Sequence, residues 1–363
     1  MLDFIPLPYY TLIYYYFLLV VVFLTYARSR STVITEKKSI DANRSLGFFA
    51  LIVTIFYVGF RPVSGAYFGD METYAKLFEN YQMGVTNRIE KDIVFDFFIQ
   101  SCAKIMSVQF FFLICNLLYV IPLWFACKKW FKEYAFYAFL ALLISFSFWA
   151  YGTNGIRNGI ATSFFLYALS KDKLQYKIAL VVLAVGIHKA MIIPAVALGV
   201  TYFYKNPKTY FYAWLLCIPL SLVSGGFWES LFSGFISDER ASYLTDGNIN
   251  DDVFSSTGFR WDFLLYSASA VYSAYFFIFK KNFADDKYNR LVCIYLTANA
   301  FWILVIRANF SNRFAYLSWF MMGVIIVYPF LTKIQVKNQH KVLGVVLVAY
   351  FGFTFLMNVI LAK

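Results

Sequence analysis

The sequence predicts an all-α integral membrane protein that crosses the bilayer many times. Of its 363 residues, 61% are hydrophobic and only 14% are charged, whereas soluble domains carry roughly 25% charged residues. Apolar runs recur from one end of the chain to the other, and basic residues gather in alternate loops between them. Together these observations predict a single membrane domain, residues 1–363, with about twelve transmembrane helices.

The apolar runs give the order of the predicted membrane helices. A helix that spans the bilayer needs about 20 apolar residues. Several runs are shorter than that, so a spanning helix there must include flanking polar residues. The runs are Ile5–Ala27, Leu46–Phe60, Phe110–Ala126, Tyr134–Tyr151, Ile156–Leu169, Tyr176–Ile187, Ala190–Tyr204, Thr209–Ser224, Trp261–Phe279, Leu291–Ile306, Phe314–Leu331 and Val342–Ala362.

The charged residues set the predicted orientation. Most of the 32 Lys and Arg residues lie in every second loop, for example at 28–44, 128–132 and 171–177. The positive-inside rule places these loops in the cytoplasm, so both termini are predicted outside. Most acidic residues lie in the other loops. Because topology accounts for the net charge of +12, we do not expect nucleic-acid binding.

Two outer loops stand out by length. The first, Arg61–Asp92, contains an amphipathic segment, METYAKLFENY, which we expect at the membrane interface. The apolar stretch Ile93–Met106 after it is interrupted by polar residues and is predicted to be re-entrant or interfacial. The second loop, Gly225–Arg260, is rich in Ser, Gly and Asp and is predicted to act as a mobile cover.

Arginines mark the outer ends of several predicted helices. A charge within a membrane helix costs roughly 3 kcal/mol, so it is usually paired or faces a polar cavity. For each arginine alone, snorkelling to outer lipid phosphates is the alternative explanation. Several at one depth favour an anionic ligand, because the guanidinium fork meets two phosphate oxygens at once. They are Arg61, Arg157, Arg260, Arg307 and Arg313.

Arg157 lies in the most distinctive segment, YGTNGIRNGIA. If a helix begins near Gly155, free backbone N–H groups and the helix dipole also favour an anion there. Asn154, Arg157 and Asn158 then share one face, at spacings of three and four residues. Gly155 and Gly159 would let another helix approach closely.

Two residues are candidates for a general base. His188 closes a predicted helix at its outer end, and its ordinary pKa suits proton transfer near neutral pH. Asp70, near Tyr74 in the first outer loop, is the carboxylate alternative, although it is equally well placed as a helix N-cap. The other histidine, His340, is predicted to be solvated in a loop. The five cysteines are scattered without a CxxC pair, so we expect no metal site.

The order of these motifs resembles that of the EpsG-like branch of the O-antigen polymerases (Wzy). The similar pieces are GFR, GD.ETY, YG.NGIRNGIA, a helix ending in IH, GFRWDF and NRF. The resemblance implies a metal-independent, inverting glycosyltransferase of the GT-C type, without a cofactor, in the bacterial inner membrane. Its active site would face the periplasm. Donor and acceptor would be undecaprenyl-diphosphate-linked oligosaccharides, and a chain-length regulator is an expected partner.

The resemblance and the residue chemistry together suggest roles. Arg157 with Arg260, Arg307 and Arg313 would hold a diphosphate, and His188 or Asp70 would be the base. Further substrate contacts are predicted for Arg61, Tyr74, Asn154 and Asn158.

Three other functions are open on the sequence alone. An O-antigen ligase would use the same donor with a different acceptor. Another GT-C transferase would use a monophosphate donor, with an acidic pair such as Asp70 and Glu72. A lipid-linked oligosaccharide flippase belongs to a different class, and it would be expected to show two related halves and mid-depth charges, neither of which is evident.

Overall fold

The computed structural model describes residues 2, 4–85, 92–233, 258–308 and 310–362, and these residues contain helices and no strand. This confirms the predicted all-α polytopic membrane fold. Seven described segments are long and apolar enough to cross a membrane. They are α1 (Leu7–Ser31), α2 (Lys37–Gly59), α6 with α7 (Val108–Leu143), most of α12 (Pro207–Phe232), α14 with η3 (Trp261–Lys280), α16 with α17 (Ser311–Thr332), and α18 with η4 (Gln339–Ile360).

Several of the other described helices on predicted runs are short, so the predicted number of twelve spans stays a prediction. Helices α9 (Ile156–Leu169) and α10 (Leu174–Ile187) have 14 residues each. At 1.5 Å per residue each covers about 21 Å, less than the roughly 30 Å hydrocarbon core. The predicted run Tyr134–Tyr151 is divided at Ser145, whose extended backbone separates α7 (Ala135–Leu143) from α8 (Phe146–Thr153).

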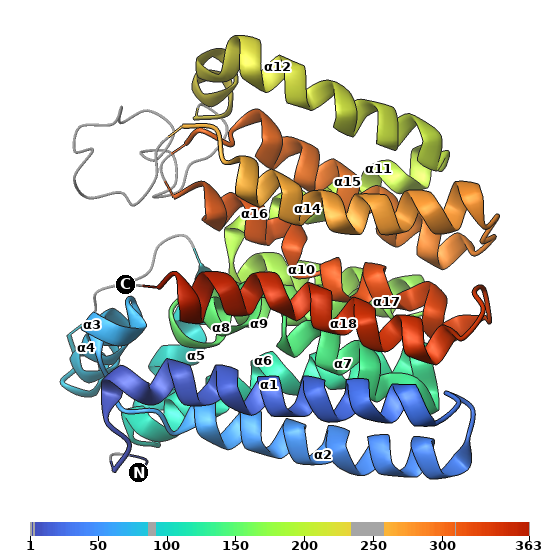
Figure 1. The fold of residues 1–363 in the computed structure, drawn as a ribbon. Coiled ribbons are helices and arrows are strands. Elements are labelled where there is room, and N and C mark those ends of the chain that lie inside the picture. Colours follow the sequence, from blue (N-terminus) through green and yellow to red (C-terminus); the bar gives the residue numbers. More distant parts are fainter. Residues whose placement is uncertain (1, 3, 86–91, 234–257, 309, 363) are drawn as a thin grey trace. The chain divides into compact units, whose positions relative to one another are not determined.

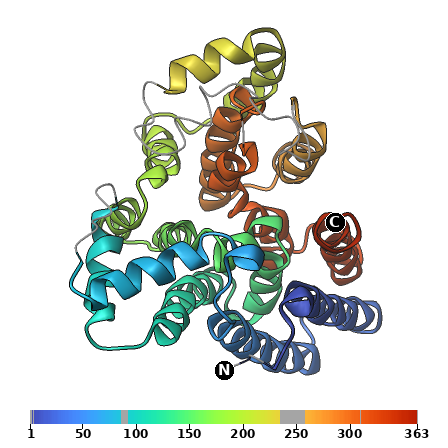
Figure 2. The same cartoon turned by 90° about the vertical axis from the view of Figure 1, so that its left-hand side faces the viewer.

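The chain forms two compact units, residues 1–189 with 327–363, and residues 190–326. In the first unit α1 packs along α18 (Gln339–Phe355) and α2 packs against α6 (Val108–Phe131) (Figures 1 and 2). Helix α6 packs in turn on α9, and α9 on α10. The second unit contains α11 (Ile192–Phe203), α12 (Pro207–Ser233), α14 (Trp261–Tyr275), α15 (Asp286–Leu304) and α16 (Ser311–Trp319). Helix α17 (Met322–Thr332) crosses the boundary between the units.

The connections of the first unit sort to two ends. The α1–α2 connection and the start of α18 lie at one end, which carries basic residues such as Arg28 and Lys341 (Figure 1). The start of α1 lies at the opposite end, together with α3 (Gly65–Phe68) and α4 (Met71–Gln82). This arrangement agrees with the predicted alternation of basic and acidic loops.

The prediction that His340 is solvated is wrong. His340 lies in the first turn of α18 and is only 4% exposed. Its Nδ1 donates to the Thr32 carbonyl at 2.8 Å, so its Nε2 accepts from the Tyr137 hydroxyl. The Asn43 amide donates to the same hydroxyl, and its oxygen accepts from Arg28. Polar side chains from four helices thus hydrogen-bond to one another, and His340 is buried among them. The lysines beside His340 in the sequence suggested a solvated loop and gave no sign of this network.

A second buried polar network holds the second unit together. The Asn299 oxygen accepts from Trp214 Nε1 at 2.7 Å, and its amide nitrogen donates to the Ser267 and Ser318 hydroxyls. The Trp319 indole also donates to Ser267. Asn299 is fully buried, and its partners come from α12, α14 and α16. One side chain on α15 therefore ties three other helices to it.

We expect Asn299→Leu to destabilise the protein by about 1–2 kcal/mol, because the substitution leaves buried indole and hydroxyl groups without a partner. Thermal unfolding of the purified protein in detergent measures the change. Thr297→Val is the matched control, since the Thr297 hydroxyl donates to the Cys293 carbonyl of its own helix and joins no other described helix. Equal loss of stability in the two variants would contradict the role of the network.

Candidate functional site

Four elements of the first unit bring Tyr74, Asp92, Arg157 and His188 together. Tyr74 lies on α4, whose buried face also includes Met71, as the predicted amphipathic pattern requires. Asp92 is the residue before α5 (Ile93–Ala103), Arg157 is in the first turn of α9, and His188 follows the last residue of α10. Helix α10 packs against both α5 and α9, and α4 packs against α5. At 11 residues α5 is too short to span, in agreement with the prediction for this stretch.

The Asp92 carboxylate is the centre of this site. Its Oδ2 accepts from Arg157 Nη1 at 2.6 Å and contacts His188 Nδ1 at 3.0 Å. Its Oδ1 accepts from the backbone N–H of Lys189 at 2.9 Å. The side chain is only 3% exposed, and it does not cap its own helix. Both oxygens are thus directed toward the ends of α9 and α10.

The environment keeps Asp92 ionised. Burial on its own would raise the pKa of the carboxyl group, since it disfavours the charged form. The hydrogen bond and charge of His188, the charge of Arg157 and the Lys189 N–H outweigh burial, so the pKa lies below its ordinary value of 3.8. At neutral pH the group is therefore a carboxylate that only accepts hydrogen bonds.

Arg157 is held along one side of its guanidinium. Nε donates to the Tyr74 hydroxyl at 2.9 Å, and Nη1 donates to Asp92. Burial raises the pKa of Tyr74 although the charge of Arg157 opposes this shift, so the hydroxyl stays neutral. The Arg157 side chain is 20% exposed, compared with 5% for His188. Arg157 is therefore the member of the salt bridge that reaches the protein surface.

The close packing of α8 on α9 fixes the position of the first turn of α9, which carries Arg157. Gly159 faces the backbone of the preceding helix, and a Cβ at this position would lie 2.6 Å from the Tyr151 carbonyl oxygen. The predicted close approach at Gly159 is therefore an approach of α8. Asn154 caps the end of α8, and its side-chain oxygen accepts from the backbone N–H of Asp70 at 2.9 Å. This bond links the first outer loop to the junction.

The other predicted residues of the first unit have different surroundings. Asp70 stands before α4, but its side chain makes no capping hydrogen bond. Asn158 follows Arg157 on α9, and its carbonyl accepts from Thr162. Arg61 is 1% exposed; it donates to the Val58 and Thr153 carbonyls. Burial lowers the pKa of Arg61 to about 10, which leaves it charged at neutral pH. The Arg61 side chain thus links the ends of α2 and α8 through hydrogen bonds. This buried position does not favour the predicted contact with substrate.

The remaining predicted arginines belong to the second unit. Arg260 is paired with Asp262 through two hydrogen bonds of 2.9 and 2.6 Å and stacks on Phe263. Arg307 donates to the Leu222 carbonyl, and Arg313 faces the Phe310 ring. Since the structure describes the two units separately, a joint diphosphate site with Arg157 stays a prediction.

Asp92 was not among the predicted site residues, although an acidic residue directly before an apolar helix is a signal that could have identified it.

The predicted cover at 225–260 falls mostly on residues 234–257, outside the described residues. Among the described residues, no group of three or more His, Cys, Asp or Glu side chains is arranged to hold a metal ion.

The comparison with protein families agrees with these motifs. The model of the EpsG family matches residues 44–363, which include all four residues of the site. The chain belongs to the EpsG family. No curated protein and no solved structure is significantly similar to it. Membership in the EpsG family makes the chain a membrane protein of polysaccharide biosynthesis that is similar to glycosyltransferases.

In this EpsG-family protein we expect Gly159→Ala to lower the melting temperature, because the added methyl group meets the Tyr151 carbonyl and pushes α8 from α9. Gly199→Ala on α11 is the matched control, since beyond the backbone of its own helix no described atom lies within 4 Å of its added Cβ. The control should be neutral or stabilising by about 0.4–1 kcal/mol. Unchanged stability of Gly159→Ala would contradict the close packing at the junction.

We also expect Asp92→Asn to destabilise the EpsG-family protein in a pH-dependent way. A carboxylate with a lowered folded-state pKa stabilises the fold above its ordinary pKa, and this contribution is lost as pH falls through the folded value. The difference in melting temperature between wild type and variant should therefore be present at pH 7 and shrink below pH 3.8. A difference that is the same at pH 7 and pH 3 would show that the charge of Asp92 does not matter.

Proposed function

We propose that this EpsG-family protein is a surface-polysaccharide polymerase. It would transfer a growing glycan from undecaprenyl diphosphate to the non-reducing end of a lipid-linked repeat unit. The observation that carries the proposal is the buried Asp92 carboxylate, which contacts both a histidine and an arginine. A glycosyl transfer from a diphosphate needs both groups: a base for the acceptor hydroxyl and a cation for the leaving group.

His188 is the proposed base. Because Nδ1 is directed at Asp92, the neutral imidazole carries its proton on Nδ1 and its lone pair on Nε2. The acceptor hydroxyl oxygen attacks C1 of the donor sugar while the bond from C1 to the diphosphate oxygen breaks. The hydroxyl proton passes to Nε2, and the bonding electrons leave with the diphosphate. Asp92 stays ionised and stabilises the imidazolium ion. Asp70, the alternative from the sequence, contacts Asn154 through its backbone N–H, and its carboxylate is not part of this network of described residues.

Arg157 is the proposed cation for the diphosphate. Negative charge on the leaving group grows in the transition state, and a fixed guanidinium stabilises it more than it stabilises the ground state. Tyr74 and Asp92 fix the Arg157 side chain from one side, so little reorganisation is needed when the charge develops. The positive end of the α9 helix dipole, where Arg157 lies, adds to the positive potential. In this proposal the chain supplies the charge without a metal ion.

Reconstitution tests the proposal directly. The full chain is placed in liposomes with synthetic undecaprenyl-diphosphate-linked repeat units, and the products are separated by size. A ladder of longer glycans supports a polymerase. Transfer to core lipid alone would make the protein a ligase, and movement of the lipid across the bilayer without bond formation would make it a flippase.

In this assay we expect Arg157→Ala and His188→Ala each to slow polymerisation about 100-fold or more. Added imidazole should restore part of the rate to His188→Ala and none to Arg157→Ala, which separates a missing base from a missing cation. Lys76→Ala is the control, because Lys76 is an exposed cation on the same helix as Tyr74 and pairs with Glu72. Normal glycan length in either site variant would refute its assigned role.

A further inference from the structure

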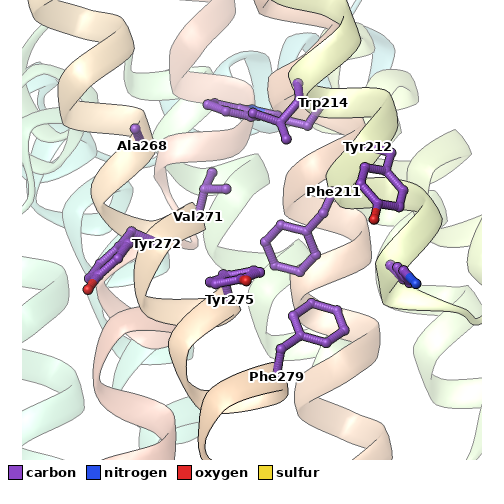
Figure 3. Close-up of a pocket in the computed structure, with 10 residues that line it drawn as sticks. Phe211, Tyr212, Trp214, Ala268, Val271, Tyr272, Tyr275 and Phe279 are labelled. Atoms are coloured by element: carbon purple, nitrogen blue, oxygen red, sulfur yellow. The ribbon is translucent and has the colours of Figure 1, made fainter.

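A groove in the second unit runs between α12 and α14. Its volume is about 490 Å³, and its walls are almost entirely apolar and aromatic (Figure 3). Phe211, Trp214 and Val271 are buried and form the inner wall, whereas Tyr212 and Tyr272 are exposed at the rim. This size falls within the range of about 300–1,000 Å³ that is typical of small-molecule sites.

The groove belongs to a membrane setting. Both helices that line it are among those long and apolar enough to cross the bilayer. Both also pack on α15, which holds them beside each other. An exposed leucine, Leu215, lies among the lining residues. Because hydrocarbon surrounds a spanning helix, the ligand that matches such walls is a lipid chain.

One end of the groove is positively charged. Lys208, near the start of α12, lines the groove, and so does Phe279, directly before Lys280 and Lys281 at the end of η3. The Lys208 ammonium lies 5.9 Å from the centre of the Tyr212 ring, so it is directed along the groove wall. The positive-inside rule places this basic end at the cytoplasmic face. Basic pockets between membrane helices on that face bind the headgroups of acidic lipids.

We propose that the groove binds one anionic phospholipid of the inner leaflet. An acyl chain lies against Phe211 and Trp214, and the phosphate meets Lys208. A zwitterionic lipid offers the same chain, but its own ammonium group competes with Lys208 for the phosphate. The proposal does not depend on the polymerase reaction, because the groove lies in the other unit from Arg157 and His188.

Native mass spectrometry of the purified full chain tests this site. The protein in detergent is titrated with phosphatidylglycerol or phosphatidylcholine of equal chain length. We expect phosphatidylglycerol to bind more tightly, and Lys208→Gln to weaken its binding about fivefold while phosphatidylcholine is unaffected. Lys205→Gln, a change of a nearby basic residue that does not line the groove, should leave both affinities unchanged.

A second variant tests the acyl-chain contact. Ala268→Trp fills the groove from α14 and should weaken the binding of both lipids. Equal affinity of the wild type for the two lipids would overturn the proposal, as would equal effects of the Lys208 and Lys205 variants. Displacement of phosphatidylglycerol by an undecaprenyl diphosphate carrier at equal concentration, or closure of the groove by a second copy of the chain, would also overturn it.

Discussion

The candidate site depends on the pairing of the buried Asp92 carboxylate with Arg157, His188 and the Lys189 N–H. An ionised group in an apolar interior is expensive unless it is paired and hydrogen-bonded. Asp92 meets this requirement only when the start of α9, the end of α10 and the start of α5 are all in place. The need to satisfy one charge therefore fixes the positions of three helix ends. Arg157 and His188 receive their orientation as a result.

Elsewhere in the two units, helices are joined by buried polar side chains that are not ion pairs. His340 and Asn299 are buried, and each joins several helices through neutral hydroxyl, amide, indole or carbonyl groups. Neutral networks of this kind are sufficient to hold helices together in a membrane. A salt bridge between buried Asp92 and partly exposed Arg157 costs more to assemble than these neutral networks, because both charged groups lose water.

Most of the architecture was predictable because it follows from periodicity and from where charges lie. The apolar runs fall on helices, α4 has the expected amphipathic face, and Arg157 and His188 meet through a common partner. That partner was missed because Asp92 lies 65 and 96 residues away from them, and its position directly before an apolar helix does not show which distant residues it contacts. His340 was misjudged for the same reason, since only the fold brings Tyr137 and Thr32 to it.

The lengths of α9 and α10 have a consequence for the depth of the candidate site in the membrane. If the lysines between these helices lie at the inner surface, helices of about 21 Å end some 9 Å short of the outer edge of a 30 Å hydrocarbon core. Arg157 and His188 mark those outer ends. The charged groups would then lie below the level of the outer membrane surface, at the bottom of a depression. A diphosphate attached to a polyprenyl chain would reach this depression with its lipid still in the bilayer, whereas a water-soluble sugar phosphate would have to leave water to arrive there. In the proposed reaction, the thickness of the surrounding bilayer would therefore favour lipid-linked substrates over water-soluble ones.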